Sequence, residues 1–189
     1  MNVASPKRTR QKLLSTIVAV KEALSSRKRN PTTFQTLCRR TDLLIYWASK
    51  LAKEDPLAFG DDKGDYRTSL LASATALELW CRELVRDGNR SSSYTDRTRE
   101  LGRAAYYMNR YLLPWLVILE DPQSMASVMD LALNELALNF PKPKPNDRHR
   151  KYYLRNLKEL LRWADDLGVE YDKGKLQYLF IEGPDVFFV

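Results

Sequence analysis

The chain has 189 residues, of which 44% are hydrophobic and 29% are charged, and its formal net charge is +7. A single domain is the default at this length, and the apolar content is sufficient for a sizeable core. Neither a run long enough to cross a membrane nor the apolar stretch of a secretory signal is found, so we expect a cytoplasmic protein without a membrane partner.

The positive charge is concentrated near the N-terminus. Residues 1–53 hold 12 Lys and Arg but only two acidic residues, whereas residues 54–189 hold 19 basic and 22 acidic residues. A basic end on a nearly neutral body favours a polyanionic partner, and nucleic acid before a membrane surface. The two cysteines, Cys38 and Cys81, lie in apolar helical patterns, and we predict buried, reduced thiols.

Helical periodicity predicts three helices in the first half of the chain, over about 7–27, 32–53 and 66–86. The segment Asp55–Gly64 is rich in Pro, Gly and Asp and predicts a loop. Asp87–Asn89 is expected to end the third helix at its glycine. The predicted core positions of these helices are Leu13, Ile17, Val20, Leu24, Leu37, Leu44, Ala48, Leu51, Leu70, Ala74, Leu77 and Cys81.

Three more helices are predicted in the second half. The first begins at Thr95-Asp96, and Pro114 is expected to kink or split it because proline removes a backbone donor. The second starts at Asp121-Pro122 and is apolar nearly all round, and the third runs from about Asp147 to Leu167. An extended linker, Phe140–Asp147, joins these two helices.

The resulting fold class is all-α, a helical bundle of about six helices. A short C-terminal tail, 169–189, has the aromatic and β-branched composition of a β-hairpin or extended strand. We expect one domain over 1–189, and two lobes over 1–54 and 65–168 are the alternative.

Catalytic signatures are missing from the sequence. The one histidine, His149, has no arginine four to six residues before it and no metal-ligand spacing to the cysteines. There is no phosphate-binding glycine loop and no serine or zinc hydrolase motif. We therefore predict a non-enzymatic protein without a metal or cofactor; an enzyme with a site dispersed along the chain is a further hypothesis.

Basic residues recur at helical spacing, which places them on common faces. Arg99, Arg103, Tyr106 and Arg110 form what we call the first stripe, and Lys151, Arg155, Lys158 and Arg162 form the second stripe. The other basic groups are Lys7, Arg8, Arg10 and Lys12, then Arg27, Lys28 and Arg29, then Arg82, Arg86 and Arg90.

Such stripes can neutralise successive phosphates, which gives affinity without sequence preference, and Tyr106 can stack on an exposed base. The competing interpretation is a solvated face with internal ion pairs, such as Glu159 with Arg155 or Arg162. We predict a nucleic-acid-backbone-binding protein, DNA or RNA. The alternative is a helical adaptor whose basic face meets an acidic protein.

In size, helical class and charge the chain resembles the small subunits of CRISPR effector complexes. The resemblance extends over the whole chain and depends on no single motif. It implies a subunit of a multi-subunit ribonucleoprotein that stabilises a bound or displaced strand. The implied partners are nucleic acid, neighbouring subunits and further copies of the chain itself.

Overall fold

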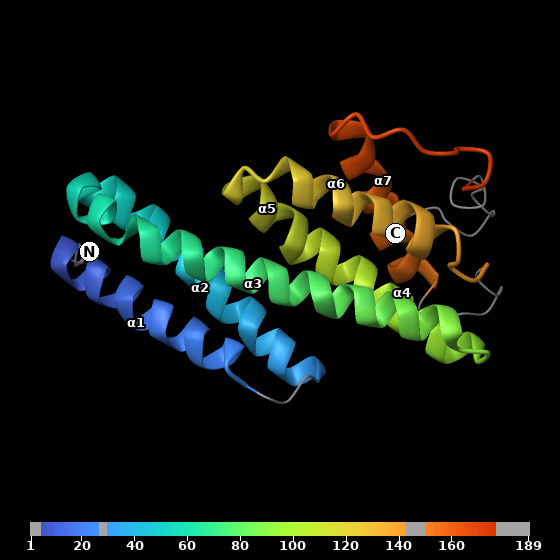
Figure 1. The fold of residues 1–189 in the computed structure, drawn as a ribbon, viewed down its shortest axis with the longest axis horizontal. Helices are drawn as coiled ribbons and strands as arrows, with labels where there is room; N and C mark the ends of the chain where they lie inside the picture. Colours follow the sequence, from blue (N-terminus) through green and yellow to red (C-terminus); the bar gives the residue numbers. More distant parts are fainter. Residues whose placement is uncertain (1–4, 27–29, 143–149, 177–189) are drawn as a thin grey trace. The chain divides into compact units, whose positions relative to one another are not determined.

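A computed structural model describes residues 5–26, 30–142 and 150–176, and this part of the chain is all helical (Figure 1). Its helices join into six continuous helical segments, as predicted. Two of the segments contain a π-helical turn, labelled η. In chain order they are α1 (Pro6–Leu24); α2 (Pro31–Glu54); α3 (Pro56–Arg90); α4, η1 and α5 (Tyr94–Tyr107, Met108–Leu112 and Leu113–Leu119); α6 and η2 (Pro122–Asp130 and Leu131–Ala137); and α7 (Arg150–Asp166).

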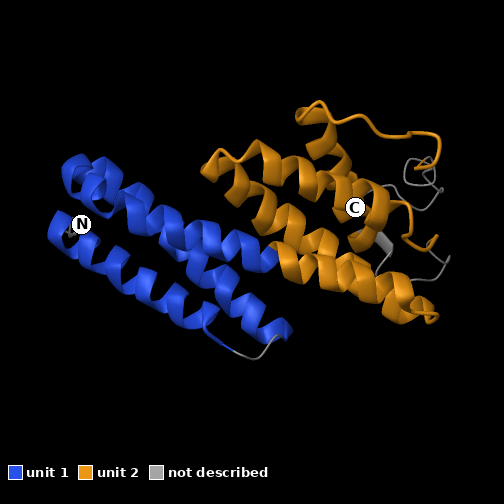
Figure 2. Cartoon of the chain, viewed as in Figure 1, with its two compact units in different colours: residues 1–77 blue, residues 78–189 orange. Residues whose placement is uncertain are grey.

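The chain divides into two compact units, Met1–Leu77 and Glu78–Val189, and the division falls within α3 (Figure 2). Unit 1 contains α1, α2 and the N-terminal part of α3. Unit 2 contains the remainder of α3 and the segments that follow it. Each unit has its own buried apolar side chains, so each is described by itself.

In unit 1, α1 and α2 are antiparallel neighbours. Arg40 near the start of α2 donates to the carbonyl of Ala19 near the end of α1, at 2.6 Å. At the opposite end, the Thr9 hydroxyl donates to Glu54 at 2.6 Å. The predicted core of unit 1 is buried except for Leu24, which is half-buried.

The predicted loop over Asp55–Gly64 is wrong, because α3 begins at Pro56. The Asp55 carboxylate accepts from the backbone N–H of Ala58 at 3.0 Å, so it caps the helix, and proline is well tolerated in a first helical turn. Asp62 on the next turn holds Arg10 of α1 through two hydrogen bonds, at 2.8 and 3.0 Å. Capping and this long-range contact together outweigh the local preference for a loop.

Two other helix ends also differ from the prediction. α2 begins at Pro31, one residue before the predicted start, and Asn30 caps it, since its Oδ1 accepts from the backbone N–H of Thr33 at 3.0 Å. The third helix continues past Gly88 to Arg90. Gly88 is buried, and a Cβ at this position would lie 2.9 Å from the Leu101 side chain, so its role is close packing.

In unit 2, Pro114 leaves the chain helical but changes its winding. The N–H of Leu113 donates to the carbonyl of Met108, five residues earlier, which defines the π turn η1. Proline cannot donate to the carbonyl four residues before it and would clash with that carbonyl in a regular α-helix. The wider turn relieves the clash, and Trp115 and Leu116 beyond it are almost fully buried.

The second π turn, η2, follows α6, which begins at Pro122 as predicted and is capped by Asp121. The Glu135 carbonyl in η2 accepts from the Asn89 amide of α3 at 3.0 Å and from the Asn139 amide at 2.9 Å. Side chains thus supply hydrogen bonds to a carbonyl in the irregular turn. Of the predicted apolar positions here, Val128, Leu131, Leu133 and Leu136 are buried, and Leu138 is exposed.

The helix α7 ends near Gly168, which has a φ of +66°, a backbone conformation that favours glycine. The predicted β-like tail falls mainly on residues 177–189, which lie outside the described residues. Most of the predicted linker before α7, and His149, lie outside them too.

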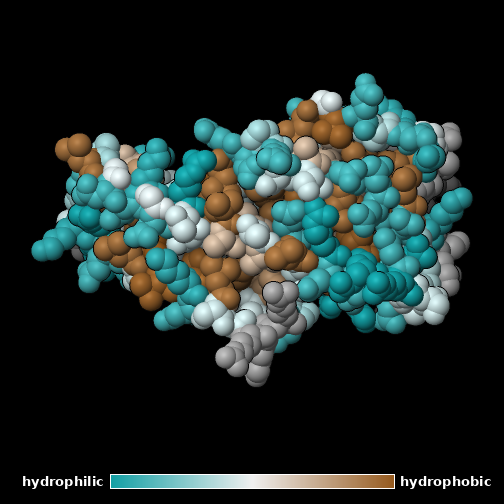
Figure 3. Space-filling view, in the orientation of Figure 1, coloured by the Kyte–Doolittle hydropathy of each residue, from teal (hydrophilic) through white to brown (hydrophobic). Residues whose placement is uncertain are grey.

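Both cysteines are buried and free, as predicted. Burial raises the pKa of the Cys38 thiol to about 12. In the described ranges, no helix is both long and apolar enough to cross a membrane. Some apolar side chains reach the surface, among them Leu43 and Tyr46 of α2 and Val117 and Ile118 of α5, and hydrophobic patches lie between polar ones in Figure 3.

Candidate nucleic-acid interface

The first basic group lies on α1 in unit 1. Lys7, Arg8 and Lys12 are exposed and form no ion pair within the described residues. Arg10 differs from them, because its guanidinium is held by Asp62, and this hydrogen bond raises the pKa of Arg10 above its ordinary value. Arg10 therefore serves the packing of α1 on α3. The group Arg27, Lys28 and Arg29 lies outside the described residues.

On α3, Arg82 is engaged within unit 2. Its guanidinium is 2.9 Å from Glu78 and also donates to the Ser127 hydroxyl at 2.8 Å. Arg86 lies 3.5 Å from Asp87, and both side chains are exposed. Arg90 is exposed and makes no ion pair in the described part of the chain. This group thus offers few cations to a ligand.

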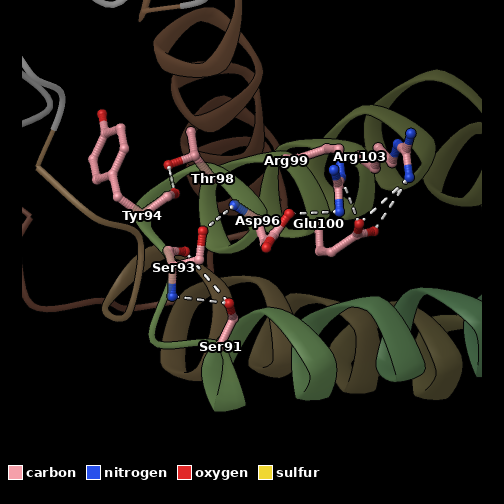
Figure 4. Close-up of polar contacts among 8 residues, drawn as sticks. All are labelled: Ser91, Ser93, Tyr94, Asp96, Thr98, Arg99, Glu100 and Arg103. Atoms are coloured by element: carbon pink, nitrogen blue, oxygen red, sulfur yellow. Dashed lines mark hydrogen bonds and ion pairs between the residues drawn. The ribbon is translucent and has the colours of Figure 1, made fainter.

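The first stripe is neutralised at its N-terminal end (Figure 4). Arg99 and Arg103 both reach Glu100, at 2.8 and 3.4 Å, and Arg99 also lies 2.8 Å from Asp96. The hydrogen bond to Glu100 raises the pKa of Arg99. Ser93 caps the helix beneath these pairs by accepting from the Asp96 N–H at 3.3 Å. Acidic neighbours on the same helix therefore bind these two arginines.

The second stripe is also neutralised at one end. Arg162 lies 2.7 Å from Glu159, which is one of the two pairings anticipated from sequence. Arg155 is exposed and makes no ion pair in the described part of the chain, and Lys158 is half-buried. The side chain of Lys151 lies outside the described residues.

Tyr106 and Arg110 of the first stripe meet Arg155 of the second in one groove between the α4–η1 segment and α7, with a volume of about 350 Å³. We call it the tyrosine–arginine groove. Its lining residues are Tyr106, Asn109 and Arg110 on one side and Tyr152, Arg155, Asn156, Glu159 and Trp163 on the other. The rings of Tyr106 and Tyr152 lie with their centroids 6.2 Å apart and their planes 35° apart.

One asparagine hydrogen bond joins the two sides of the groove, and a second lies within α7. The Asn109 side chain donates to the backbone carbonyl of Asn156 at 2.6 Å, and the Asn156 side chain donates to the carbonyl of Tyr152 at 3.0 Å. Asn156 is only 9% exposed. These bonds fix the turn of α7 that carries Tyr152 against the π turn that carries Arg110.

Close packing of α4 on α7 depends on Gly102. A Cβ at this position would overlap the ring of Tyr153, so only glycine allows the present approach of the two helices. The Tyr153 ring is in turn packed against Phe140, with centroids 5.9 Å apart, and against Tyr152, 5.7 Å apart. Gly102 and Tyr153 therefore set the spacing of the helices beside the groove.

Sequence reasoning missed half of this groove. It selected Tyr106, Arg110 and Arg155, but not Tyr152, Trp163 or the two asparagines. A signal was present, because Tyr152, Arg155, Asn156, Glu159 and Trp163 follow steps of three, one, three and four, which places them on one face of a helix. Only the fold shows that this face lies opposite η1.

The described residues contain no cluster of three or more His, Cys, Asp or Glu side chains able to hold a metal ion. Comparison with known proteins gives no relative: no family model, curated protein or solved structure matches the chain.

Proposed function

We propose that this chain is a non-catalytic protein that binds the sugar–phosphate backbone of nucleic acid through the tyrosine–arginine groove. The observation that carries the proposal is the meeting of the two stripes in that groove. Arg110 and Arg155 are both exposed there, beside aromatic rings. Cations beside aromatic rings are the usual composition of sequence-tolerant nucleic-acid grooves.

The arrangement of charge supports phosphate as the ligand. Arginine presents a planar fork of donors that matches phosphate oxygens. Arg110 also lies over the Tyr111 ring, with its Cζ 5.2 Å from the ring centroid, which restricts its mobility. The exposed cations Lys7, Arg8 and Lys12 give unit 1 a polyanion-binding surface of its own.

Charge reversal tests the proposal. We expect Arg110→Glu/Arg155→Glu to weaken binding to labelled oligonucleotides strongly, and to reduce the slope of log affinity against log salt by about 1.4, since each phosphate contact on a single strand contributes about 0.7. The matched control is Arg39→Glu/Lys53→Glu on α2, which makes the same change in net charge at exposed positions outside the groove.

Equal losses in both variants would mean that net charge alone drives binding. No binding by the wild-type chain from about 50 mM salt upward would remove the proposal. If an acidic protein then competed for the same surface, the adaptor hypothesis would replace it.

We extend the proposal to a place within a multi-subunit ribonucleoprotein, as the likeness to CRISPR small subunits implies. Exposed apolar side chains on α2 and α5 support protein neighbours as well as a nucleic acid. We expect several copies to assemble along one strand. Sedimentation with oligonucleotides of increasing length would then show stepwise increases in mass, and a single copy at every length would contradict this part.

A further inference from the structure

The Tyr152 side chain is both exposed and held in place. Its exposed fraction is 47%. The ring nevertheless has two aromatic neighbours, Tyr106 at 6.2 Å and Tyr153 at 5.7 Å between centroids. An aromatic ring that is already fixed before binding loses little conformational entropy when a flat ligand stacks on it.

The size of the groove limits what can reach this ring. A volume of about 350 Å³ is at the low end for a ligand pocket and cannot admit a double helix. In a duplex the faces of the bases are covered by their neighbours, so only an unpaired base can present its face to a side chain.

The charges around the groove suit a base that remains attached to its backbone. Arg110 and Arg155 are exposed on opposite sides of the groove, one on η1 and one on α7. Glu159 also lines the groove, but its carboxylate is engaged by Arg162 at 2.7 Å. The phenol of Tyr152 is neutral at neutral pH and does not repel a phosphate, and burial raises its pKa further from that range.

We infer that the tyrosine–arginine groove takes one unpaired nucleobase, stacked on Tyr152, with its flanking phosphates on Arg110 and Arg155. The protein would therefore select single-stranded nucleic acid over duplex. This inference rests on the proposed function and narrows its ligand from any nucleic acid to a strand with accessible bases.

The test uses the full chain and three probes of equal length: a single-stranded oligonucleotide, its duplex, and a single strand of the same charge with abasic sites at successive positions. We expect the normal strand to bind at least about tenfold more tightly than the abasic strand, as one stacked base contributes that much. The same measurements with a DNA strand and with an RNA strand of the same sequence show which of the two nucleic acids supplies the unpaired base.

Variants of Tyr152 assign the effect to the ring. We expect Tyr152→Leu to lose about tenfold in affinity for the normal strand and nothing for the abasic strand, because the phosphate contacts remain. Tyr152→Phe retains the ring and should bind like the wild type. Fluorescence of 2-aminopurine in the strand should be quenched by the wild type and by Tyr152→Phe alone.

The outcomes distinguish stacking of a base on Tyr152 from binding of the nucleic-acid backbone. Equal binding of normal, abasic and duplex probes would overturn the stacked base and leave backbone binding intact. An equal loss for Tyr152→Phe and Tyr152→Leu would also overturn it, since the ring would then be irrelevant. Absence of binding to every probe would overturn the proposed function itself.

Discussion

The packing of α4 on α7 can be tested by adding a single methyl group at Gly102. Alanine in a helix interior is ordinarily about 0.5–1 kcal/mol more favourable than glycine. At Gly102 the new Cβ would overlap the ring of Tyr153, which two aromatic neighbours hold in place. Overpacking of this kind costs about 1–3 kcal/mol, so we expect Gly102→Ala to lower the free energy of unfolding by about 1–2 kcal/mol.

Urea denaturation followed by circular dichroism measures this change. Gly64 on α3 provides the contrasting site, because no atom lies within 4 Å of a Cβ placed there. We expect Gly64→Ala to stabilise unit 1 by about 0.5–1 kcal/mol, so the same substitution has opposite signs at the two glycines.

A second substitution identifies the cause of the loss. If overlap with Tyr153 is responsible, Tyr153→Ala removes the obstacle, and the double variant should show a favourable coupling of about 1–2 kcal/mol. Stabilisation by Gly102→Ala, or a coupling near zero, would refute the close approach of α4 and α7 and with it the geometry of the groove.

Three further predictions concern charge, burial and the π turn. Glu100→Gln should raise nucleic-acid affinity several-fold and steepen its salt dependence, because it removes the carboxylate that pairs with Arg103 and one of the two that pair with Arg99. Unchanged binding would place these arginines outside the interface. Folding raises the pKa of Cys38, so the folded state favours the neutral thiol. This contribution to the free energy of unfolding is complete below pH 9, the pKa of the unfolded state, and is lost as pH rises from about 9 toward 12. The free energy of unfolding should therefore fall more steeply over this range for the wild type than for Cys38→Ala; parallel curves would count against burial of the thiol. Asn89→Ala should cost about 1 kcal/mol in unit 2, since it removes the amide that donates to the Glu135 carbonyl in η2, and denaturation that matches the wild type would show the bond to be unimportant.

Periodicity in the sequence was sufficient for the helices and their core positions. Apolar residues at steps of three and four identify faces such as Leu13, Ile17 and Val20 because a helix buries one side. The same approach failed at Asp55–Gly64, because Asp and Pro are favoured at a capped helix start as well as in a loop and the two glycines favour a loop. The contact from Arg10, more than 50 residues away in sequence, has no local signature.

For the candidate site, sequence identified cations but not which of them are available. Arg99 and Arg155 look equivalent on a helical wheel, yet Asp96 and Glu100 bind the first while the second makes no ion pair in the described part of the chain. The groove depends on the pairing of α4 with α7, and that pairing depends on the missing side chain at Gly102. A missing side chain gives no signal in a search for functional groups.

The π turn before Pro114 also constrains the length of the chain. A π turn holds one residue more than the α turn it replaces, so the faces of α4 and α5 differ in phase by about 100°. Deleting one residue from Met108–Leu112 would replace the π turn by an α turn, in which the Pro114 ring would clash with the carbonyl four residues before it. Homologues of this chain should therefore vary in the residues of η1 and keep their number.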